Sequence, residues 1–413
     1  MTTTDSLGRV AVDPFGSDIA AEMAKLRALG PVVAVELPGG IPAWAPTEYG
    51  VLKDLILDPR VSKNPRLHWR LWPELGEHPA WGWVLGWVGV VNMFTTYGPE
   101  HARLRRLVAP SFTHKRTEAM RPRVEAITAE LLDTVESAGV DGRVVDAKRL
   151  FAYELPIRMI CELFGVPVVL RADVAELVAA IMDTSDPGPE HTAFVQARIG
   201  TVLGSLIAYR REHPGDDMTT ELIRVRDEDG DGLSDEELLY TLLLVIGAGF
   251  ETTVNLIGNA IVALLSDPAQ LAVVRSGQAS WDAVVDETLR VHPSIASLPL
   301  RFAVSDLKVR GVTIPAGDAI LTTYAAAGLD PAHYGGAAHV FDAARGAGDH
   351  MAFGIGVHRC LGAPLARLEA LTALPALFDR FPGLTPAFEP GELRQVPSFI
   401  AFGWQQVPVR LNG

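Results

Sequence analysis

Apolar residues recur at three- and four-residue spacing in three long segments, at residues 117–135, 237–265 and 361–378. This is the period of amphipathic and buried α-helices. Strand-like runs are short and few: VVAVEL from residue 32, LKVRGVTI at 307–314 and QVPVRL near the end. The pattern predicts a mainly α fold with small β-sheets at its edges.

Proline and glycine are scattered between the periodic segments, and no linker, repeat or low-complexity block divides the chain. The chain has 413 residues, of which 48% are hydrophobic and 21% charged, so it can bury a large core. We therefore expect residues 1–413 to form a single large domain.

The charge balance excludes one class of partner. Lysine and arginine number 36 against 50 acids, a net charge of -14, which disfavours nucleic acid because phosphate binding needs a basic face. The first 18 residues lack the basic and apolar blocks of a signal peptide, and no later apolar run looks long enough to span a bilayer. We expect a cytoplasmic protein with no membrane contact.

The acidic stretch DEDGDGLSDEEL, residues 227–238, resembles a calcium-binding loop, but its twelfth position is Leu238 instead of a bidentate glutamate. We interpret it as a solvated turn, followed by a capping box of Ser234 and Glu237 that opens the long helix. Of the two cysteines, Cys161 lies in an apolar helical pattern and is predicted to be core.

The stretch FGIGVHRCLGAPLAR, residues 353–367, holds the other cysteine, Cys360. Its glycines allow unusual backbone conformations and a close approach to a flat ligand. Pro364 predicts a helix that begins at or just after Cys360, so backbone N–H groups and the helix dipole would favour a thiolate. Zinc or an iron–sulfur cluster would need more ligands than one cysteine, whereas haem needs one axial thiolate.

With the residues that follow it, this stretch resembles the haem-binding signature of the cytochrome P-450 superfamily, the haem-thiolate monooxygenases, in its bacterial form. Further segments appear in the family's order along nearly the whole chain. The resemblance implies the cytochrome P-450 fold, haem b with Cys360 as iron ligand, and O2 as co-substrate. Phe353, Gly354 and Ala248 are the expected haem contacts beside it.

The segment GAGFETT, residues 247–253, lies inside the long apolar helix. Its glycines weaken a helix, and close packing against a neighbour is one explanation. The other is a local widening over the oxygen site, with Thr252 diverting a backbone hydrogen bond. Glu251 and Thr252 resemble the family's catalytic acid–alcohol pair, in which the alcohol steadies the iron-bound peroxide and the acid helps to deliver protons from solvent.

Two further sets of residues match the family's motifs. In DETLRVHP, Glu287 and Arg290 lie three residues apart on one helix face, a spacing that allows a surface ion pair. The resemblance implies instead a buried pair that is completed by Arg345 and supports the cysteine loop. The haem propionates need cationic or hydrogen-bonding partners. The matching residues are His101, Arg105, Arg301 and His358.

The sequence departs from the family where relatives carry Asn-Arg-Asp-Pro before the cysteine loop, since this chain has GLDP at 328–331. The tryptophan-rich run at 81–94 is either core or part of a loop over the substrate. The resemblance places the substrate against Val91, Leu244, Ala248, Ile295, Ser297, Leu298 and Ile400.

Segments of the chain look closest to actinobacterial enzymes that hydroxylate steroids, polyketides and other bulky apolar molecules. Hydroxylation of such a substrate is the expected reaction; oxidative aryl coupling without oxygen insertion and a non-catalytic ligand-binding role are the alternatives. The chain has no dinucleotide fingerprint of its own, so NAD(P)H electrons must come through a separate ferredoxin and ferredoxin reductase. We expect a monomer with a basic docking cluster: Arg103, Arg106, Lys115, Arg116 and Arg359.

Overall fold

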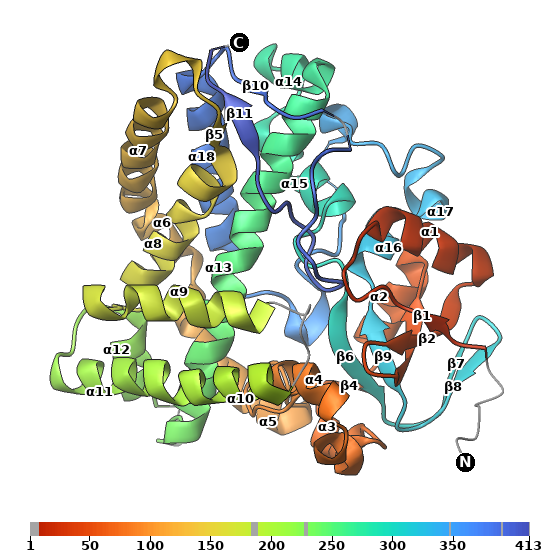
Figure 1. The fold of residues 1–413 in the computed structure, drawn as a ribbon. Coiled ribbons are helices and arrows are strands. Elements are labelled where there is room, and N and C mark those ends of the chain that lie inside the picture. Colours follow the sequence, from red (N-terminus) through yellow and green to blue (C-terminus); the bar gives the residue numbers. More distant parts are fainter. Residues whose placement is uncertain (1–7, 183–188, 227–229, 347, 390, 413) are drawn as a thin grey trace.

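A computed structural model describes residues 8–182, 189–226, 230–346, 348–389 and 391–412. A helix of 32 residues, α13 (Asp235–Ser266), passes through the centre of the molecule (Figure 1). Its N-terminus carries the predicted capping box, in which Ser234 Oγ accepts from the Glu237 N–H and the Glu237 carboxylate accepts from the Ser234 N–H. The calcium-like loop before it lies partly outside the described residues.

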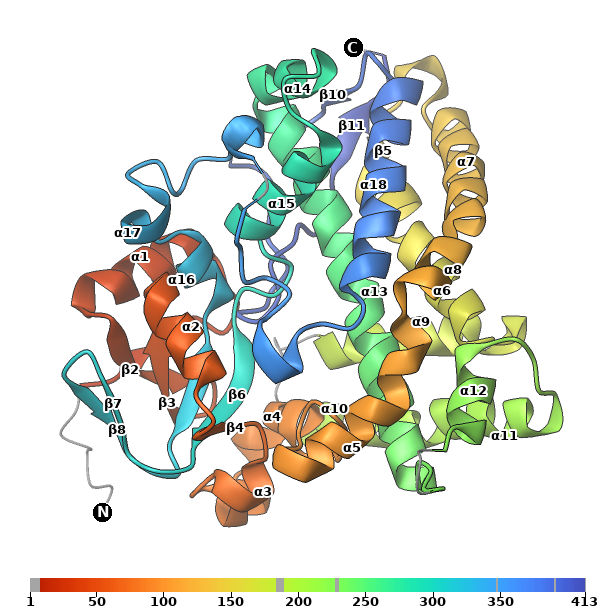
Figure 2. The same ribbon diagram turned by 180° about the vertical axis from the view of Figure 1, so that it is seen from behind.

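By length and composition α13 could cross a membrane, so the expectation that no apolar run is long enough is wrong for this helix. Of its most apolar window, 61% is buried inside the protein, as in a core helix. It packs against α8 (Glu154–Leu163), α15 (Trp281–Val291) and α18 (Ala363–Arg380). Figure 2 shows α18 running beside α13, with α7 on its other side.

The remaining helices surround this centre or cover the sheet. They are α1 (Ile19–Leu29), α2 (Tyr49–Leu57), α3 (Pro65–His68), α4 (Gly82–Val88), α5 (Gly98–Val108), α6 (His114–Ala119), α7 (Arg121–Ala138), α9 (Val168–Met182), α10 (Pro189–Arg198), α11 (Gly204–Glu212), α12 (Met218–Arg224), α14 (Pro268–Arg275), α16 (Tyr324–Gly328) and α17 (Pro331–Tyr334). Short π-helical segments span Lys148–Ala152 and Ile199–Leu203, and a 3-10 turn, η8, spans Gly356–His358.

The strands form a larger sheet than the sequence pattern suggests. Six strands pair in the order β1-β2-β3-β9-β6-β4, and a second sheet has the order β10-β11-β5. The strands are β1 (Val10–Ala11), β2 (Val32–Leu37), β3 (Ile41–Pro46), β4 (Val61–Ser62), β5 (Val145–Asp146), β6 (Leu298–Ala303), β7 (Leu307–Val309), β8 (Val312–Ile314), β9 (Ala319–Thr322), β10 (Thr385–Pro386) and β11 (Pro408–Arg410). The predicted strand at 307–314 is the β7–β8 hairpin.

One predicted helix is divided. The pattern at 117–135 runs across a break, since α6 ends at Ala119 and α7 begins at Arg121 with Pro122 in its first turn. Proline has no N–H to donate and clashes with the preceding turn, so it begins a helix more readily than it continues one. The helix predicted at 361–378 begins at Ala363, directly after the cysteine loop, as expected.

Candidate active site

A deep, mostly apolar cavity lies between α13 and α18 and is closed by α5, the segment at 86–94 and the cysteine loop. Cys360 and Thr252 both face it, from opposite elements. Its apolar wall includes Trp87, Val90, Met93, Phe94, Phe112, Ile160, Leu163, Ile181, Leu243, Leu244, Val245, Ile295 and Leu298. The cavity therefore joins the expected iron ligand to the expected oxygen site and to a large apolar surface.

The cysteine loop owes its shape to two glycines. Gly354 and Gly356 have φ of 67° and 69°, a region that side chains with a Cβ rarely adopt. The Cys360 N–H donates to the Phe353 carbonyl at 2.8 Å, and this hydrogen bond joins the two ends of the loop. Gly362 has an ordinary helical φ of -79°, so the expectation that it needs glycine's freedom is wrong.

The Cys360 sulfur opens onto the cavity at the start of α18. Burial raises the pKa of its thiol, while the N–H groups of Gly362 and Ala363 and the charge of Arg105 act in the opposite direction. These N–H groups are the ones predicted from the position of Pro364. They lie where a metal-bound thiolate would accept hydrogen bonds.

Four basic residues converge beside the cysteine loop, from α5, β6 and η8. The rings of His101 and His358 are 4.1 Å apart, and Arg105 Nη2 donates to the Arg359 carbonyl at 2.8 Å. His101 and Arg301 are 5% and 4% exposed, and His101 Nε2 and Arg301 Nε have no partner in the described part of the chain. Burial lowers the pKa of both, and also that of His358. Buried donors without acceptors are costly, so this cluster fits an anionic group.

On the opposite wall, the Thr252 hydroxyl donates to the Ala248 carbonyl at 2.6 Å, the predicted diversion of a backbone hydrogen bond. The helix stays regular here, so the expected widening is not seen. Gly249 supports the packing explanation, because a Cβ there would meet Ile160 at 2.8 Å, whereas Gly247 faces open space. Both glycines line the cavity.

Glu251 does not line the cavity. One residue before Thr252 on the helix, it faces Lys148 and Asn255 instead. Burial raises the pKa of its carboxyl, and the charge of Lys148 and the amide of Asn255 oppose that shift. Lys148 in turn donates from Nζ to the Trp404 carbonyl at 2.6 Å. The acid and the alcohol are thus neighbours in the chain on different sides of the helix.

Glu287 and Arg290 form a buried pair, not a surface one. They are 2% and 1% exposed, with Glu287 Oε1 2.6 Å from Arg290 Nη2. Arg345 Nε joins Glu287 Oε1 at 3.2 Å. Arg290 also donates to the carbonyls of Gly328 and Ala338 at 2.7 and 2.5 Å. The network ties α15 to the segment before the cysteine loop, and the altered GLDP segment contributes a backbone acceptor to it.

Only some of the residues expected to contact substrate line the cavity. Leu244, Ala248, Ile295 and Leu298 line the cavity. Val91, Ser297 and Ile400 are not in its wall, so the structure does not bring them together with the other four, and their contact with substrate stays a prediction. Ile400 is 1% exposed within the core beneath the sheet, and its carbonyl accepts from the Ser297 N–H at 3.3 Å. The wall beside Val91 is formed by its neighbours instead.

The tryptophan-rich run at 81–94 contributes to the core and to the cavity wall. Trp81 and Trp83 are buried in the core, and their indole N–H groups donate to the carbonyls of Gly39 and Pro38 at 2.8 and 3.0 Å. Trp87 lines the cavity.

Two buried titratable residues near the site were not anticipated. Glu369 lines the cavity from α18, is 1% exposed, and its Oε2 has no partner among the described residues. Burial raises the pKa of its carboxyl to about 8. The other is Lys63, at the end of β4. A single polar residue in a helical or strand pattern gives no sign of its burial, so sequence patterning could not find either.

Two residues of the expected docking cluster are engaged within the chain. Arg103 forms an ion pair with Glu237, and Arg116 forms one with Glu221. Lys115 and Arg359 are exposed. The cluster is therefore less basic than the sequence suggests.

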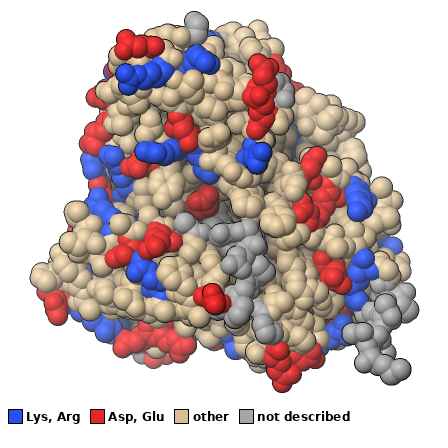
Figure 3. Space-filling model, viewed as in Figure 1, with Lys and Arg blue, Asp and Glu red and all other residues tan. Residues whose placement is uncertain are grey.

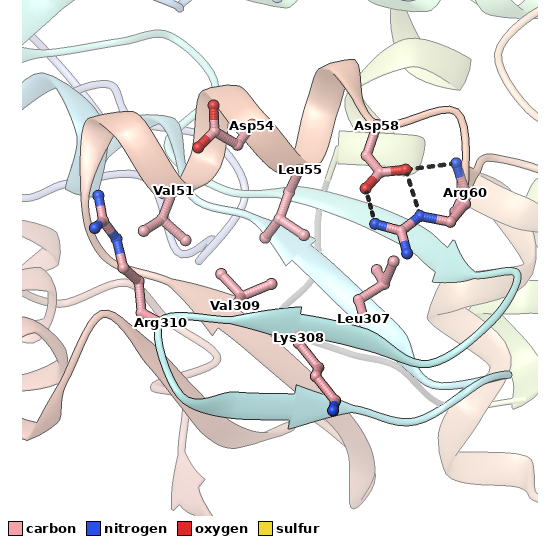
Figure 4. A pocket seen from close by; sticks show the side chains of 9 residues that line it. All are labelled: Val51, Asp54, Leu55, Asp58, Arg60, Leu307, Lys308, Val309 and Arg310. Atoms are coloured by element: carbon pink, nitrogen blue, oxygen red, sulfur yellow. Dashed lines mark hydrogen bonds and ion pairs between the residues drawn. The ribbon is translucent and has the colours of Figure 1, made fainter.

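A second pocket lies at the surface, between α2 and the β7–β8 hairpin (Figure 4). Asp58 on its rim is paired with Arg60 at 2.6 Å, and Asp54, Lys308 and Arg310 contribute the other charges. It contains no cysteine or histidine and lies apart from the cavity that holds Cys360.

Comparison with known proteins agrees with this geometry. A family model of cytochrome P-450 matches residues 281–411. The chain is 42% identical over 406 residues to 2-hydroxy-5-methyl-1-naphthoate 7-hydroxylase of Streptomyces carzinostaticus, covering 97% of both chains. It is 38% identical over 420 residues to 6-deoxyerythronolide B hydroxylase of Saccharopolyspora erythraea, covering all of both.

The solved structure of CYP154A1 from Streptomyces coelicolor A3(2) superposes with a TM-score of 0.92 at 46% identity, over 98% of this chain and 100% of that one. Similarity of this extent shows the family, and Cys360 before a helix start, with glycines on both sides, agrees with it. The chain belongs to the cytochrome P-450 family and is a haem-thiolate monooxygenase.

Proposed function

We propose that this monooxygenase hydroxylates a bulky, hydrophobic secondary metabolite of the polyketide, aromatic or steroid kind. The observation that carries the proposal is the cavity wall, which is built mostly from aliphatic and aromatic side chains. The two relatives named above are hydroxylases of a naphthoate and of 6-deoxyerythronolide B. An apolar wall with few polar groups selects for size and hydrophobicity.

The enzyme uses haem b, O2 and electrons from NAD(P)H that reach it through redox partners. When bound, haem supplies the centre at which dioxygen is activated. Cys360 would hold the iron, with Phe353, Gly354 and Ala248 against the ring. His101, Arg105, Arg301 and His358 would hold the carboxylates, and the unpartnered nitrogens of His101 and Arg301 support this fit.

In the proposed mechanism, Thr252 positions a proton at the oxygen site through the hydroxyl that now donates to Ala248. Glu251 would gather protons on the far side of α13, where its raised pKa keeps its carboxyl protonated over a wider pH range. Because Glu251 does not line the cavity, a rotation of its side chain or a bridging water would have to complete the path to Thr252. Glu287, Arg290 and Arg345 would act as support for the cysteine loop.

The test has two steps. A panel of aromatic, macrolide and steroid compounds is first screened for the low-spin to high-spin shift of the haem spectrum, which reports occupancy of the cavity. Turnover of each binder under 18O2 then separates the reactions: hydroxylation adds one labelled oxygen, whereas aryl coupling yields a dimer or ring without label. Binding without turnover, with a competent redox system, would favour the non-catalytic alternative.

The iron ligand is tested separately. Wild-type enzyme should give the red-shifted Soret band of a thiolate-ligated ferrous carbon monoxide complex, and Cys360→Ser should lose it. A wild-type spectrum like that of a globin would refute the assignment.

We further propose a monomeric, cytoplasmic enzyme served by a ferredoxin and its reductase. Acidic and basic side chains are interspersed over the face seen in Figure 3, as on a soluble monomer. Size-exclusion chromatography with light scattering tests the oligomeric state.

A further inference from the structure

Lys63 is a buried lysine beside the cluster proposed to hold the haem carboxylates. It directly follows β4 and is 2% exposed. Its Nζ lies 3.4 Å from the Pro299 carbonyl oxygen and 3.5 Å from the centre of the Phe94 ring. No ion pair joins it to an Asp or Glu in the described ranges.

A lysine in this position is unfavourable in the protein alone. Burial lowers the pKa of Lys63 well below its usual value, and the charge of Arg301 adds to that effect. A carbonyl and a ring face compensate only partly for the loss of water around an ammonium group. A nearby anion would remove the penalty.

The neighbours of Lys63 show where such an anion would lie. Pro299 is two residues before Arg301 on β6, and Arg301 has an unpartnered, buried Nε. Burial lowers the pKa of His358, and the neighbouring basic groups of Arg301, His101, Lys63 and Arg105 lower it further. Lys63 thus belongs to the same concentration of positive charge, although it comes from a different element.

We propose that Lys63 is a fifth residue of this cluster and neutralises a haem carboxylate together with Arg301. The inference rests on the proposed carboxylate cluster and adds a member that none of the motifs predicts. The position of Lys63 favours it: the side chain is 2% exposed, its Nζ reaches the carbonyl of Pro299 on the strand that carries Arg301, and the Nε of Arg301 has no partner among the described residues.

The same contacts suggest a competing role for Lys63, because Phe94 lines the cavity and the Lys63 Nζ lies over its ring. In that role Lys63 would fix the ring and influence substrate affinity without affecting haem. The two roles predict different results.

The experiment measures haem loss from the holoenzyme to excess apomyoglobin, followed in the Soret region, for Lys63→Met, Lys63→Gln and Lys63→Arg. We expect the two neutral variants to lose haem about tenfold faster, the change expected for one charge-assisted hydrogen bond, and Lys63→Arg to stay near wild type. The haem reduction potential should also fall in the neutral variants, because a cation near the iron has been removed.

Two reference variants make the outcome decisive. If Arg301→Met loses haem rapidly while both neutral Lys63 variants keep wild-type rates and potentials, the role of Lys63 is refuted and the carboxylate cluster stands. If Arg301→Met is also unchanged, the cluster itself is wrongly assigned. If Phe94→Leu accelerates haem loss as much as Lys63→Met does, Lys63 acts through the ring and the inference fails.

Discussion

Glu287 accepts two hydrogen bonds from Arg290, from Nε at 2.7 Å and from Nη2 at 2.6 Å, in a pair that is almost wholly buried. The remaining guanidinium donors reach carbonyls on the segment that leads to the cysteine loop. A bidentate pair fixes direction as well as distance, so α15 and this segment move together.

Removing one charge of this pair should therefore destabilise the fold strongly. In Glu287→Gln the Arg290 cation is left buried without its counter-charge, a change of about 3–5 kcal/mol in the free energy of unfolding. Denaturation of the holoenzyme, with haem content measured in parallel, checks this. The control is Glu118→Gln, which breaks an exposed pair with Arg121 of the same i,i+3 spacing and should cause little change. Equal effects in the two variants would mean that burial of the pair is not what matters.

The pairing of Glu287 with Arg290 follows from their spacing on one helix face, but their burial does not. Both a surface pair and a buried one satisfy the same three-residue spacing, and only the packing of the distant 328–340 segment decides between them. The glycine-bracketed Cys360 loop, in contrast, is predictable because the loop and the helix start are local in sequence.

The large sheet and the three expected substrate residues outside the cavity wall show what local sequence patterns cannot predict. β3 pairs with β9 through Ala43 with Ala319 and Trp44 with Ile320, contacts between residues far apart in the chain. The positions of Ser297 and Ile400 depend on a pairing of the same kind between distant segments. Lys63 was missed because a lone lysine before Asn64 and Pro65 resembles a surface residue.

The hydroxyl of Thr252 is expected to control the coupling of electron consumption to product formation. Thr252→Ala should divert most reducing equivalents to hydrogen peroxide and sharply lower the product formed per NAD(P)H, because no hydroxyl remains to position a proton at the oxygen site. Thr252→Ser keeps the hydroxyl and should retain most of the coupling. Product and peroxide are quantified with a substrate that gives a full spin shift. Unchanged coupling in Thr252→Ala would assign the step to another group.

The raised pKa of Glu369 makes the stability of the fold depend on pH. Its carboxyl titrates near 8 in the folded protein and near 4.5 in the unfolded chain, so between these values the folded state holds the extra proton. Stability of the wild type should therefore fall as pH rises from 4.5 to 8, by up to about 1.4 kcal/mol per unit from this group.

Glu369→Gln removes that dependence and should gain stability relative to wild type over this range, with the difference levelling above pH 8. Unfolding midpoints of both proteins across pH 5–9 measure it, with Glu77→Gln at an exposed position as control. A difference that does not change with pH would show that Glu369 is not the titrating group.

Electron delivery should depend on Lys115, an exposed residue of the expected docking cluster, because two of the cluster's arginines are engaged in internal ion pairs. Arg103 and Arg116 are held by Glu237 and Glu221, so reversing them would also break internal ion pairs. Lys115 lies exposed on α6, next to α18, the helix that begins at Ala363 directly after the cysteine loop. An acidic ferredoxin approaching the cysteine side would be attracted to it.

Lys115→Glu should slow haem reduction several-fold at low ionic strength, with the difference vanishing as salt screens the charges. Lys308→Glu makes the same charge reversal on the distant β7–β8 hairpin and is the matched control. Stopped-flow reduction of the ferric enzyme under carbon monoxide measures the rate. Equal slowing in both variants would reflect net charge alone, and no slowing in Lys115→Glu would place the docking site elsewhere.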